Sequence, residues 1–357
     1  MSVEPTKPVS NRVPGGKVRV LIVDDSAVVR QVLSRELARD PNIEVVGTAA
    51  DPFIARERIV ELDPDVLTLD VEMPRMDGVT FLRHLMKAKP MPVIVLSSLT
   101  QAGTQTAVDA LAAGAVDVMG KPGSSFSVDD VAPALARRIQ SAARARVRAV
   151  AAPSTVLTSS LVTTDKIFAI GASTGGVQAL TEVITAFPKN GPGTLVVQHM
   201  PAKFTASFAQ RLGSLSQMEV REAKDGDTLI PGRVLIAPGG LHMLLRRSGA
   251  TYVVEIKDGP PVRHQKPSVE VMFQSVAQAA GRNAVGAILT GMGDDGAQGL
   301  LTMRNAGART VAQDEATSVV YGMPGAAVRC GAVERTVPLA SVARTMMEFV
   351  EEMSRRT

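Results

Sequence analysis

The residues best suited to chemistry in this 357-residue chain surround a serine at position 173. Ser173 is the central residue of a Gly-x-Ser-x-Gly pattern, which runs from Gly171 to Gly175. A run of apolar residues at 167–170 precedes the pattern and predicts a buried strand, and apolar residues at helical spacing follow it as far as Pro188. We therefore expect Ser173 on a tight turn between a strand and a helix, where backbone N–H groups can stabilise a developing negative charge.

Three interpretations of this turn follow from its residue types. The Gly-x-Ser-x-Gly pattern is typical of a nucleophile elbow, in which the serine hydroxyl attacks a carbonyl carbon. The glycines also fit a dinucleotide-binding turn, although the full Gly-x-Gly-x-x-Gly spacing is missing. In the third interpretation, Ser173 only caps the helix that follows. The turn by itself leaves all three open, so residues elsewhere in the chain have to separate them.

Composition limits the class of protein. The length suits about two domains, and 45% hydrophobic with 21% charged residues is typical of a soluble globular protein. Neither end carries a secretory signal and no apolar run is long enough to cross a bilayer, so we expect a cytoplasmic protein without membrane insertion. The formal net charge of +4 is mild, and no aromatic residues interleave the arginines at 137–148, which argues against a nucleic-acid partner. The single cysteine, Cys330, excludes an internal disulfide framework and is expected to pack as a small hydrophobic residue.

The first half of the chain alternates between strand and helix patterns. Apolar runs predict strands at 18–23, 43–47, 66–69, 93–96 and 115–119. Helical spacing of apolar residues predicts helices at 29–37, 53–62, 79–86, 104–113 and 128–144. Such successive strand–helix units predict a doubly wound parallel sheet with helices on both faces.

Polar residues follow directly on these predicted strands: Asp24, Asp25, Asp70, Ser97 and Lys121. The carboxyl ends of parallel strands meet at the sheet edge where ligands bind. Three carboxylates there repel one another unless a hard cation lies between them, and Mg²⁺ suits such a site. A carboxylate nucleophile, a metal, a lysine and a hydroxyl together make a phosphoryl-transfer site. A single aspartate at a strand end is usually a helix N-cap, but that role does not explain polar residues at every matching strand end.

The motifs around these residues resemble those of a response-regulator receiver domain over about residues 18–143. The segments that carry the resemblance are Leu21–Ser26, Leu69–Gly78, Leu96–Ser98 and Gly120–Pro122. The resemblance implies that Asp70 is the phosphoacceptor and that Ser97 and Lys121 sense the acyl phosphate. It also implies a Mg²⁺ ion, held by Asp24, Asp25, Asp70 and the backbone of Glu72. The chain departs from the family at Val118, where receivers commonly carry an aromatic residue that acts as a rotamer switch.

A second alternating pattern follows a segment rich in Ala, Arg, Ser, Thr and Val. Apolar runs predict strands at 167–170, 194–199, 234–237, 284–289 and 309–312, and a hairpin at 243–245 and 252–256. Helices are predicted at 177–187, 204–212, 269–280 and 339–353, and around Leu300 and Met303. This half is therefore expected to form a second, mostly parallel α/β sheet with a hairpin insertion. We place the two domains at residues 17–143 and 165–353, with a disordered arm at 1–16 and a linker at 144–164.

Strand-end residues in the second half help to separate the interpretations of the serine turn. A dinucleotide site needs an acidic residue at the end of its second strand, but the strand after Ser173 ends in Gln198 and His199. Ser173, His199 and Asp295 each follow a predicted strand on one sheet edge. A serine hydroxyl becomes nucleophilic beside a base, and the base needs a carboxylate to orient it. The chain order Ser, His, Asp differs from that of the α/β-hydrolases, so we expect the same chemistry on a different topology.

Three further histidines and a second aspartate compete for these roles. His84 is expected on the surface of a helix, His264 lies in a proline-rich loop, and His242 could line the same sheet edge. His199 is favoured as the base because it ends the buried strand beside the strand of Ser173. Spacing alone does not separate Asp294 from its neighbour at 295, since either could orient the histidine while the other caps the helix.

These segments together resemble the CheB-type chemotaxis protein-glutamate methylesterases, and with the receiver in front the resemblance spans nearly the whole chain. The segments are Gly171–Gly176, Gln198–Met200, Ala237–Gly239, Pro267–Val269 and Leu289–Gly296. The resemblance implies Ser173 as nucleophile, His199 as base and Asp295, rather than Asp294, as the residue that orients the base. The residues at the family's oxyanion positions are Thr174 and Met292. Asp294 itself stands where the family often carries asparagine.

The function implied by this resemblance is a phosphorylation-activated serine esterase. It would hydrolyse glutamyl methyl esters, and deamidate specific glutamines, on chemoreceptors, with a chemotaxis histidine kinase as phosphodonor and no cofactor in the esterase site. The alternative is a receiver-controlled binding module, for DNA or a protein partner, in which the triad is inert. A helix-turn-helix effector would be all-helical, whereas this half of the chain alternates strand and helix.

Overall fold

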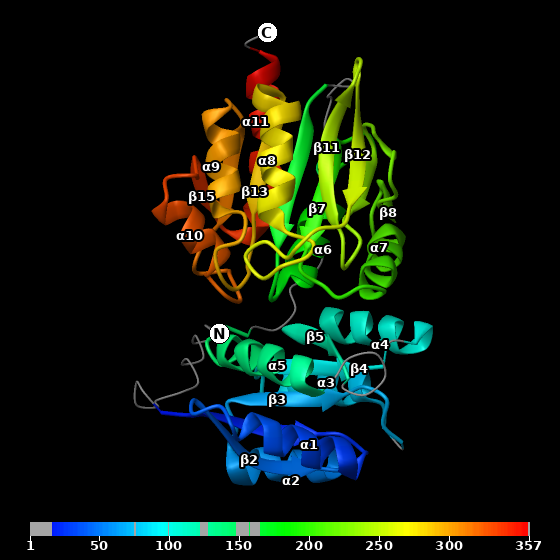
Figure 1. The fold of residues 1–357 in the computed structure, drawn as a ribbon, viewed down its shortest axis with the longest axis vertical. Helices are drawn as coiled ribbons and strands as arrows, with labels where there is room; N and C mark the ends of the chain where they lie inside the picture. The colour runs from blue at the N-terminus through cyan, green and yellow to red at the C-terminus, as the bar shows by residue number, and fades with distance from the viewer. Residues whose placement is uncertain are drawn as a thin grey trace, which may run out of the picture.

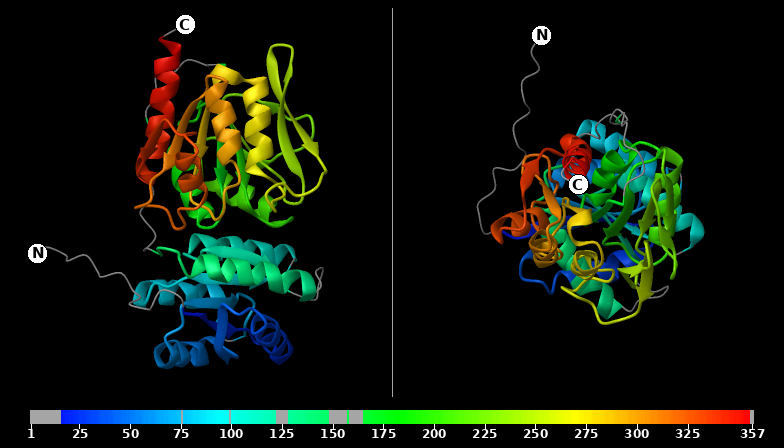
Figure 2. Two further views of the ribbon diagram at one scale, coloured as in Figure 1. Left: turned by 60° about the vertical axis from the view of Figure 1, so that its left-hand side comes forward. Right: turned by 90° about the horizontal axis from the view of Figure 1, so that it is seen from above.

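The computed structural model describes residues 16–74, 76–98, 100–121, 128–147, 157 and 165–355. These residues form two α/β domains that are stacked along the longest axis of the molecule (Figures 1 and 2). The predicted arm, apart from its last residue, and most of the predicted linker lie outside the described residues, as do Arg75 and Pro122 of the receiver-like motifs. Among the helices that are described, none is long and apolar enough to cross a membrane.

The N-terminal domain contains a five-stranded parallel sheet with the strand order β2-β1-β3-β4-β5. Its strands are β1 (Val18–Val23), β2 (Ile43–Ala49), β3 (Val66–Asp70), β4 (Val93–Ser97) and β5 (Asp117–Gly120). Its helices are α1 (Ala27–Leu37), α2 (Pro52–Leu62), α3 (Gly78–Ala88), α4 (Gln101–Ala112) and α5 (Val128–Ala142). Apolar residues of α1 and α5 pack on one face of the sheet, and those of α2, α3 and α4 pack on the other. The predicted doubly wound sheet is therefore confirmed, and its central strands β3 and β4 are buried throughout because both faces are covered.

Side-chain caps set where four helices of this domain begin. The capping residues are Ser26, Asp51, Asp77 and Thr100, and each accepts a hydrogen bond from an N–H group of the first helical turn. The cap at Thr100 explains why α4 begins at Gln101 rather than at residue 104, where the apolar spacing predicted its start. Short loops between strand ends and these caps hold the polar strand-end residues at one edge of the sheet.

The C-terminal domain contains a seven-stranded parallel sheet with the order β15-β14-β13-β6-β7-β10-β8. Its strands are β6 (Ile167–Ala172), β7 (Gly193–Gln198), β8 (Glu219–Glu222), β10 (Arg233–Ile236), β13 (Ala284–Ile288), β14 (Arg309–Gln313) and β15 (Arg335–Val337). The hairpin of β11 (His242–Ser248) and β12 (Thr251–Lys257) joins β9 (Thr228–Leu229) in a small antiparallel sheet. The parallel sheet and the hairpin insertion are both confirmed.

Helices cover both faces of the C-terminal sheet (Figure 1). They are α6 (Gly176–Thr185), α7 (Phe204–Leu215), α8 (Val269–Ala279), α9 (Ala297–Asn305), α10 (Met323–Arg329) and α11 (Leu339–Ser354). Apolar residues of α6, α7 and α11 share one cluster with one face of the sheet, and those of α8, α9 and α10 share a second cluster with the other face and the hairpin. The strands that carry the candidate site, β6 and β7, are buried from end to end.

Five elements of this domain were not predicted from the sequence: the strands β8, β9 and β15, the short helix α10, and a 3-10 turn at Gly281–Asn283. The strands β8 and β15 lie at the two edges of the sheet, and their sequences Glu-Val-Arg-Glu and Arg-Thr-Val lack the apolar runs of the central strands. Edge strands need less apolar surface because only one neighbour pairs with them. The helix α10 has only 7 residues and includes a proline and a glycine, which gives no clear helical periodicity.

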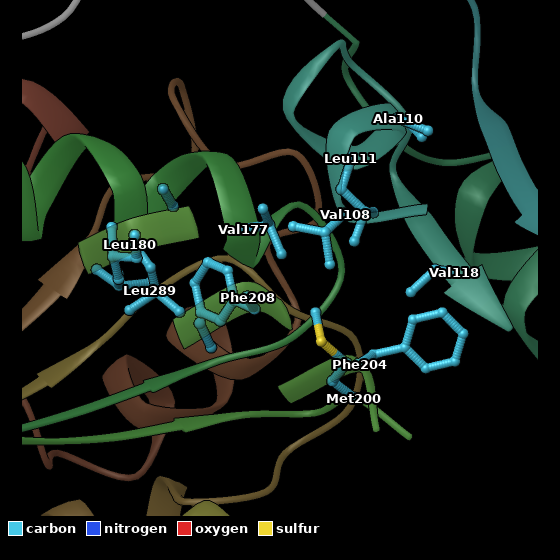
Figure 3. Close-up of a cluster of buried hydrophobic side chains, with 14 of the residues drawn as sticks. Val108, Ala110, Leu111, Val118, Val177, Leu180, Met200, Phe204, Phe208 and Leu289 are labelled. Carbon is cyan, nitrogen blue, oxygen red and sulfur yellow. The ribbon is translucent and has the colours of Figure 1, made fainter. Parts of the chain in front are cut away.

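An apolar cluster continues from one domain into the other. Val108 and Leu111 of α4 lie with Val177 of α6 and Met200 in the same cluster of buried side chains, as Figure 3 shows. Phe204, the first residue of α7, belongs to it and is fully buried. The receiver-like domain thus packs its α4 surface on the end of the C-terminal sheet that carries Ser173.

Hydrogen bonds cross the same interface. They join Arg211 Nη1 to Asp109 Oδ1 (2.6 Å), Gln178 Nε2 to the carbonyl oxygens of Ala115 (2.9 Å) and Leu111, and Gly175 N to Val116 O (2.9 Å). Gly175 belongs to the serine turn itself. The segment that leads into β5 is therefore hydrogen-bonded directly to the turn that carries Ser173.

Candidate active site

Ser173 lies on the turn between β6 and α6, as predicted. Its N–H donates to Thr290 O (3.0 Å), and its carbonyl oxygen accepts from Gln198 Nε2 (2.9 Å) and from Gly176 N (2.7 Å). The N-cap of α6 is Gly175, at φ 77°, and no side chain caps this helix, so the interpretation in which Ser173 is only a cap is wrong. The backbone of the serine is held on both sides, and its hydroxyl makes no hydrogen bond within the described part of the chain.

The turn after β13 lies directly against this serine. A Cβ atom at Gly291 would come within 2.7 Å of Ser173 Cβ, so only glycine allows the two turns to approach this closely. The next residue, Met292, and Thr174 on the serine turn are the predicted oxyanion donors. Among the described residues, neither of their backbone N–H groups has an acceptor. Two unengaged N–H groups beside a serine hydroxyl can stabilise an oxyanion.

His199 and Asp295 form a buried pair at the same sheet edge. His199 Nε2 lies 2.8 Å from Asp295 Oδ2, and the two side chains are only 3% and 2% exposed. The other ring nitrogen, Nδ1, is buried and has no hydrogen-bond partner among the described residues. A histidine with one nitrogen on a carboxylate and the other free can accept a proton from a serine hydroxyl. His199 makes no hydrogen bond to Ser173 in the described part of the structure, and such bonds are often loose before substrate binds.

The carboxylate of Asp295 is held by the N-terminus of α8. It accepts hydrogen bonds from Ser268 Oγ (2.8 Å), Val269 N (2.7 Å) and Glu270 N (3.2 Å). The positive end of the helix dipole stabilises a carboxylate in this position. Sequence reasoning gave Ser268 no role, although a serine directly before an apolar helix pattern is a recognisable N-cap, and Ser268 is the cap of α8.

Asp294 takes a different position from its neighbour. Its Oδ2 atom pairs with Arg263 Nη1 at 2.9 Å, and both side chains are about half exposed. The structure therefore brings His199 to Asp295 and leaves Asp294 at the surface.

A small cavity lies between the triad and the N-terminal domain. Its volume is about 10 Å³, which is room for about one water molecule. Ser173, Gln198, His199 and Met200 line one side, and Leu111, Val116, Asp117 and Val118 of the N-terminal domain line the other. On this side of Ser173 the N-terminal domain therefore leaves room for about one water molecule.

The N-terminal domain gathers its predicted site residues at the carboxyl edge of its sheet. One carboxylate oxygen from each of Asp24, Asp25 and Asp70 lies within 4.8 Å of the others. Lys121 Nζ lies 2.6 Å from Asp70 Oδ2 and 3.5 Å from Asp24 Oδ2. Burial raises the pKa of both Asp24 and Asp70, and the charge of Lys121 opposes that rise. Burial alone would lower the pKa of Lys121, but the hydrogen bond and charge of Asp70 raise it.

This cluster has the chemistry of a divalent-cation site. Asp24 Oδ2 is fully buried and makes no hydrogen bond among the described residues, since Lys121 Nζ lies 3.5 Å away, where it forms only a long ion pair. A buried carboxylate oxygen without a donor is costly, and a hard cation between the carboxylates would satisfy it. The residues present therefore fit Mg²⁺.

The remaining predicted residues of this domain lie around the cluster. Glu72 N donates to Asp70 Oδ1 (2.8 Å), which places the Glu72 backbone beside the carboxylates. The hydroxyl of Ser97 is buried and donates to Gly103 O in the first turn of α4 (2.8 Å). Ser97 thus connects the end of β4 to the helix that packs on the C-terminal domain. Val118 is buried and belongs to the interdomain apolar cluster (Figure 3).

The other candidate residues lie outside the triad. His84 is exposed on α3, as predicted, and His264 lies on a loop with a positive φ of 63°. His242 is buried, and its ring bonds to Pro260 O and to Ser268 N rather than to the triad itself. Cys330 is half-buried against the cluster that contains α8 and α9, which agrees with its expected role as a small hydrophobic residue.

Comparisons with known proteins agree with this description. The response regulator receiver domain model matches residues 20–130, and the CheB methylesterase model matches residues 168–346. The protein-glutamate methylesterase/protein-glutamine glutaminase 4 of Anaeromyxobacter dehalogenans is 58% identical over 341 residues, which cover 94% of this chain and 96% of that protein. A protein of the same name from Syntrophus aciditrophicus, numbered 2, is 53% identical and covers 94% of this chain and 99% of its own length.

A solved structure is similar to the C-terminal half. The Thermotoga maritima CheB methylesterase catalytic domain is 36% identical with a TM-score of 0.51, over 52% of this chain and 100% of that one. With the matches to both domain models and to full-length relatives, the chain belongs to the CheB family of methylesterases, in which a response-regulator receiver domain precedes the catalytic domain.

Proposed function

We propose that this protein is a cytoplasmic, phosphorylation-activated serine esterase that hydrolyses glutamyl methyl esters, and deamidates specific glutamines, on chemoreceptors. The names of the full-length relatives, which include both methylesterase and glutaminase, support the two reactions. The observation that carries the proposal is the buried pair of His199 and Asp295, at 2.8 Å. His199 and Ser173 line the same small cavity, and the Ser173 hydroxyl has no hydrogen-bond partner within the described residues. No nucleic-acid partner is proposed.

In the first half of the reaction, Ser173 Oγ attacks the ester carbonyl carbon of the glutamyl side chain. His199 Nδ1 takes the hydroxyl proton, and the imidazolium is stabilised by Asp295. The N–H groups of Thr174 and Met292 bind the oxyanion of the tetrahedral intermediate. When the intermediate collapses, His199 returns the proton to the departing oxygen and methanol leaves, so the glutamyl carbonyl is esterified to the serine.

In the second half, water hydrolyses the acyl-enzyme. His199 accepts a proton from the attacking water and delivers it to Ser173 Oγ as the ester bond breaks. The product is a glutamate carboxylate on the substrate protein. A glutamine side chain follows the same route, except that its amide nitrogen takes the proton and leaves as ammonia.

The receiver domain controls access to this chemistry. With room for about one water beside Ser173, the interface has to separate before substrate enters. Asp70 is the proposed phosphoacceptor, with a chemotaxis histidine kinase as the phosphodonor. Asp24, Asp25, Asp70 and the backbone of Glu72 would hold Mg²⁺, and the ion would supply positive charge to the phosphoryl oxygens at Asp70. Phosphorylation of Asp70 adds negative charge beside Lys121, the residue that follows β5. At the other end of β5, the carbonyl oxygen of Val116 accepts a hydrogen bond from Gly175 N in the serine turn, so a change around Lys121 can reach that turn through one strand.

Substitution of the nucleophile tests the proposed reaction. Ser173→Ala should lower methanol release from methylated chemoreceptor membranes by more than about 1,000-fold, because the acyl-enzyme cannot form. Binding of the variant to receptor membranes should remain. The matched control is Ser214→Ala, since Ser214 is exposed on α7. Unchanged methanol release by Ser173→Ala would contradict the triad, and no release by the unsubstituted protein would favour a binding module with an inert triad.

Substitution in the interface tests the gate. Gln178→Ala removes the donor that bonds to Leu111 and Ala115 of the receiver, so it should weaken the closed arrangement. Loss of about one neutral hydrogen bond corresponds to an increase of about fivefold in methanol release without phosphodonor. Gln298→Ala, on the exposed side of α9, is the matched control and should leave the basal rate unchanged. An unaltered basal rate in Gln178→Ala would count against these contacts as part of the gate.

Thermal unfolding of the receiver domain tests the metal site. Mg²⁺ at about 100 times its Kd should stabilise this domain by about 2.7 kcal/mol, since it binds only the folded state. Asp24→Asn should abolish that stabilisation and also raise the Tm without metal, because it removes one of the buried, mutually repelling carboxylates. Glu57→Gln, on the exposed face of α2, should keep the Mg²⁺ response. An equal Mg²⁺-induced shift in Asp24→Asn would rule out this cluster as the site.

A further inference from the structure

We propose that His242, a residue outside the triad, is a positioning residue that acts on Asp295 through Ser268. The inference rests on the proposed function of the triad. It concerns the alignment of the carboxylate rather than any contact with substrate.

Both ring nitrogens of His242 have a hydrogen-bond partner, and the partners fix which nitrogen carries the proton. His242 is the first residue of β11 and is 5% exposed. Nε2 lies 3.0 Å from Pro260 O, and Ser268 N lies 3.3 Å from Nδ1. A carbonyl oxygen only accepts and a backbone N–H only donates, so Nε2 carries the hydrogen and Nδ1 is the acceptor. The neutral ring with this tautomer is the only form that satisfies both contacts.

The acceptor nitrogen of His242 is joined to the triad through a single residue. Ser268 is fully buried, and its Oγ atom lies 2.8 Å from Asp295 Oδ1. Asp295 Oδ2 in turn lies 2.8 Å from His199 Nε2. The order of contacts is therefore Pro260 carbonyl, His242, Ser268, Asp295 and His199.

Ser268 depends on His242 for its orientation. Its backbone N–H is buried and donates to His242 Nδ1, so removal of the ring would leave that donor unsatisfied. A loop covers the other side of the ring, since a Cβ atom at Gly259 would lie 3.5 Å from His242 Cδ2. With the imidazole in place, the hydroxyl of Ser268 and the N–H of Val269 both reach Asp295.

The expected effect falls on the chemical step rather than on substrate binding. Asp295 stabilises the imidazolium of His199, which forms only during the reaction. Misalignment of Asp295 should therefore lower kcat and leave KM unchanged. A residue that only supports the fold would instead change activity in proportion to the loss of folded protein.

Two substitutions at His242 separate its two hydrogen bonds. His242→Asn keeps an acceptor, Oδ1, near the position of Nδ1, but it does not reach Pro260. His242→Gln keeps an amide donor near the position of Nε2, but it loses the acceptor for Ser268. We expect His242→Gln to lower kcat by about tenfold at constant KM, whereas His242→Asn should restore kcat to within about threefold of the unsubstituted protein. His84→Asn, at an exposed histidine on α3, is the matched control.

The assay is methanol release from methylated receptor membranes by full-length protein with phosphodonor, with the Tm of each variant measured in parallel. Equal activity of the Asn and Gln variants, or a change in KM alone, would overturn the proposal. Nitrogen-15 NMR of the full-length protein provides a test that needs no activity: it should show His242 protonated at Nε2 and not at Nδ1. A proton on Nδ1 would overturn the inference even if the triad is correct, whereas absence of turnover in the unsubstituted protein would overturn the proposed function instead.

Discussion

The candidate active site, at the carboxyl ends of β6, β7 and β13, depends on one buried carboxylate. Asp295 is 2% exposed, and a charge at such a depth is tolerated only when hydrogen bonds satisfy it. Its partners come from the start of α8, through Ser268, Val269 and Glu270, and from His199 at the end of β7. Because β6 lies between β13 and β7 in the parallel sheet, the same arrangement places Ser173 between the histidine and the aspartate turns.

The receiver domain places carboxylates at the equivalent edge of its own sheet, but it satisfies them differently. Asp24 and Asp70 are fully buried, and Lys121 is the cation that reaches both. Burial therefore raises the pKa of each carboxyl group. Asp295 is satisfied by donors of the protein itself, whereas Asp24 Oδ2 has no hydrogen-bond partner among the described residues. The segment before β5 connects them, since Val116 bonds to the serine turn.

Much of this arrangement is predictable because strand ends in a parallel sheet share one edge. The apolar runs predicted both parallel sheets, and the polar residues that follow them predicted that His199 lies near Asp294 or Asp295 and that the carboxylates lie near Lys121. The choice of Asp295 came from the family resemblance, because the spacing alone did not separate the two aspartates. The polar edge strands β8 and β15 and the short helix α10 were missed because they lack apolar periodicity. The contacts between the two domains could not be predicted from periodicity or motifs, because they join residues far apart in the chain. One example is the hydrogen bond from Gln178 Nε2 to the carbonyl oxygen of Ala115. The hydrogen bonds of Ser268 to Asp295 and to His242 were not predicted for the same reason, because they too join residues far apart in the chain.

We propose that phosphorylation of Asp70 uncovers an esterase site at Ser173. The most direct measurement is methanol release from methylated chemoreceptor membranes by the full-length protein, with and without a small-molecule phosphodonor in the presence of Mg²⁺. We expect slow release without phosphodonor and a marked rise with it, because the closed interface leaves room for about one water beside the serine. Release at the same rate in both conditions would contradict the gate, and release in neither would contradict the esterase.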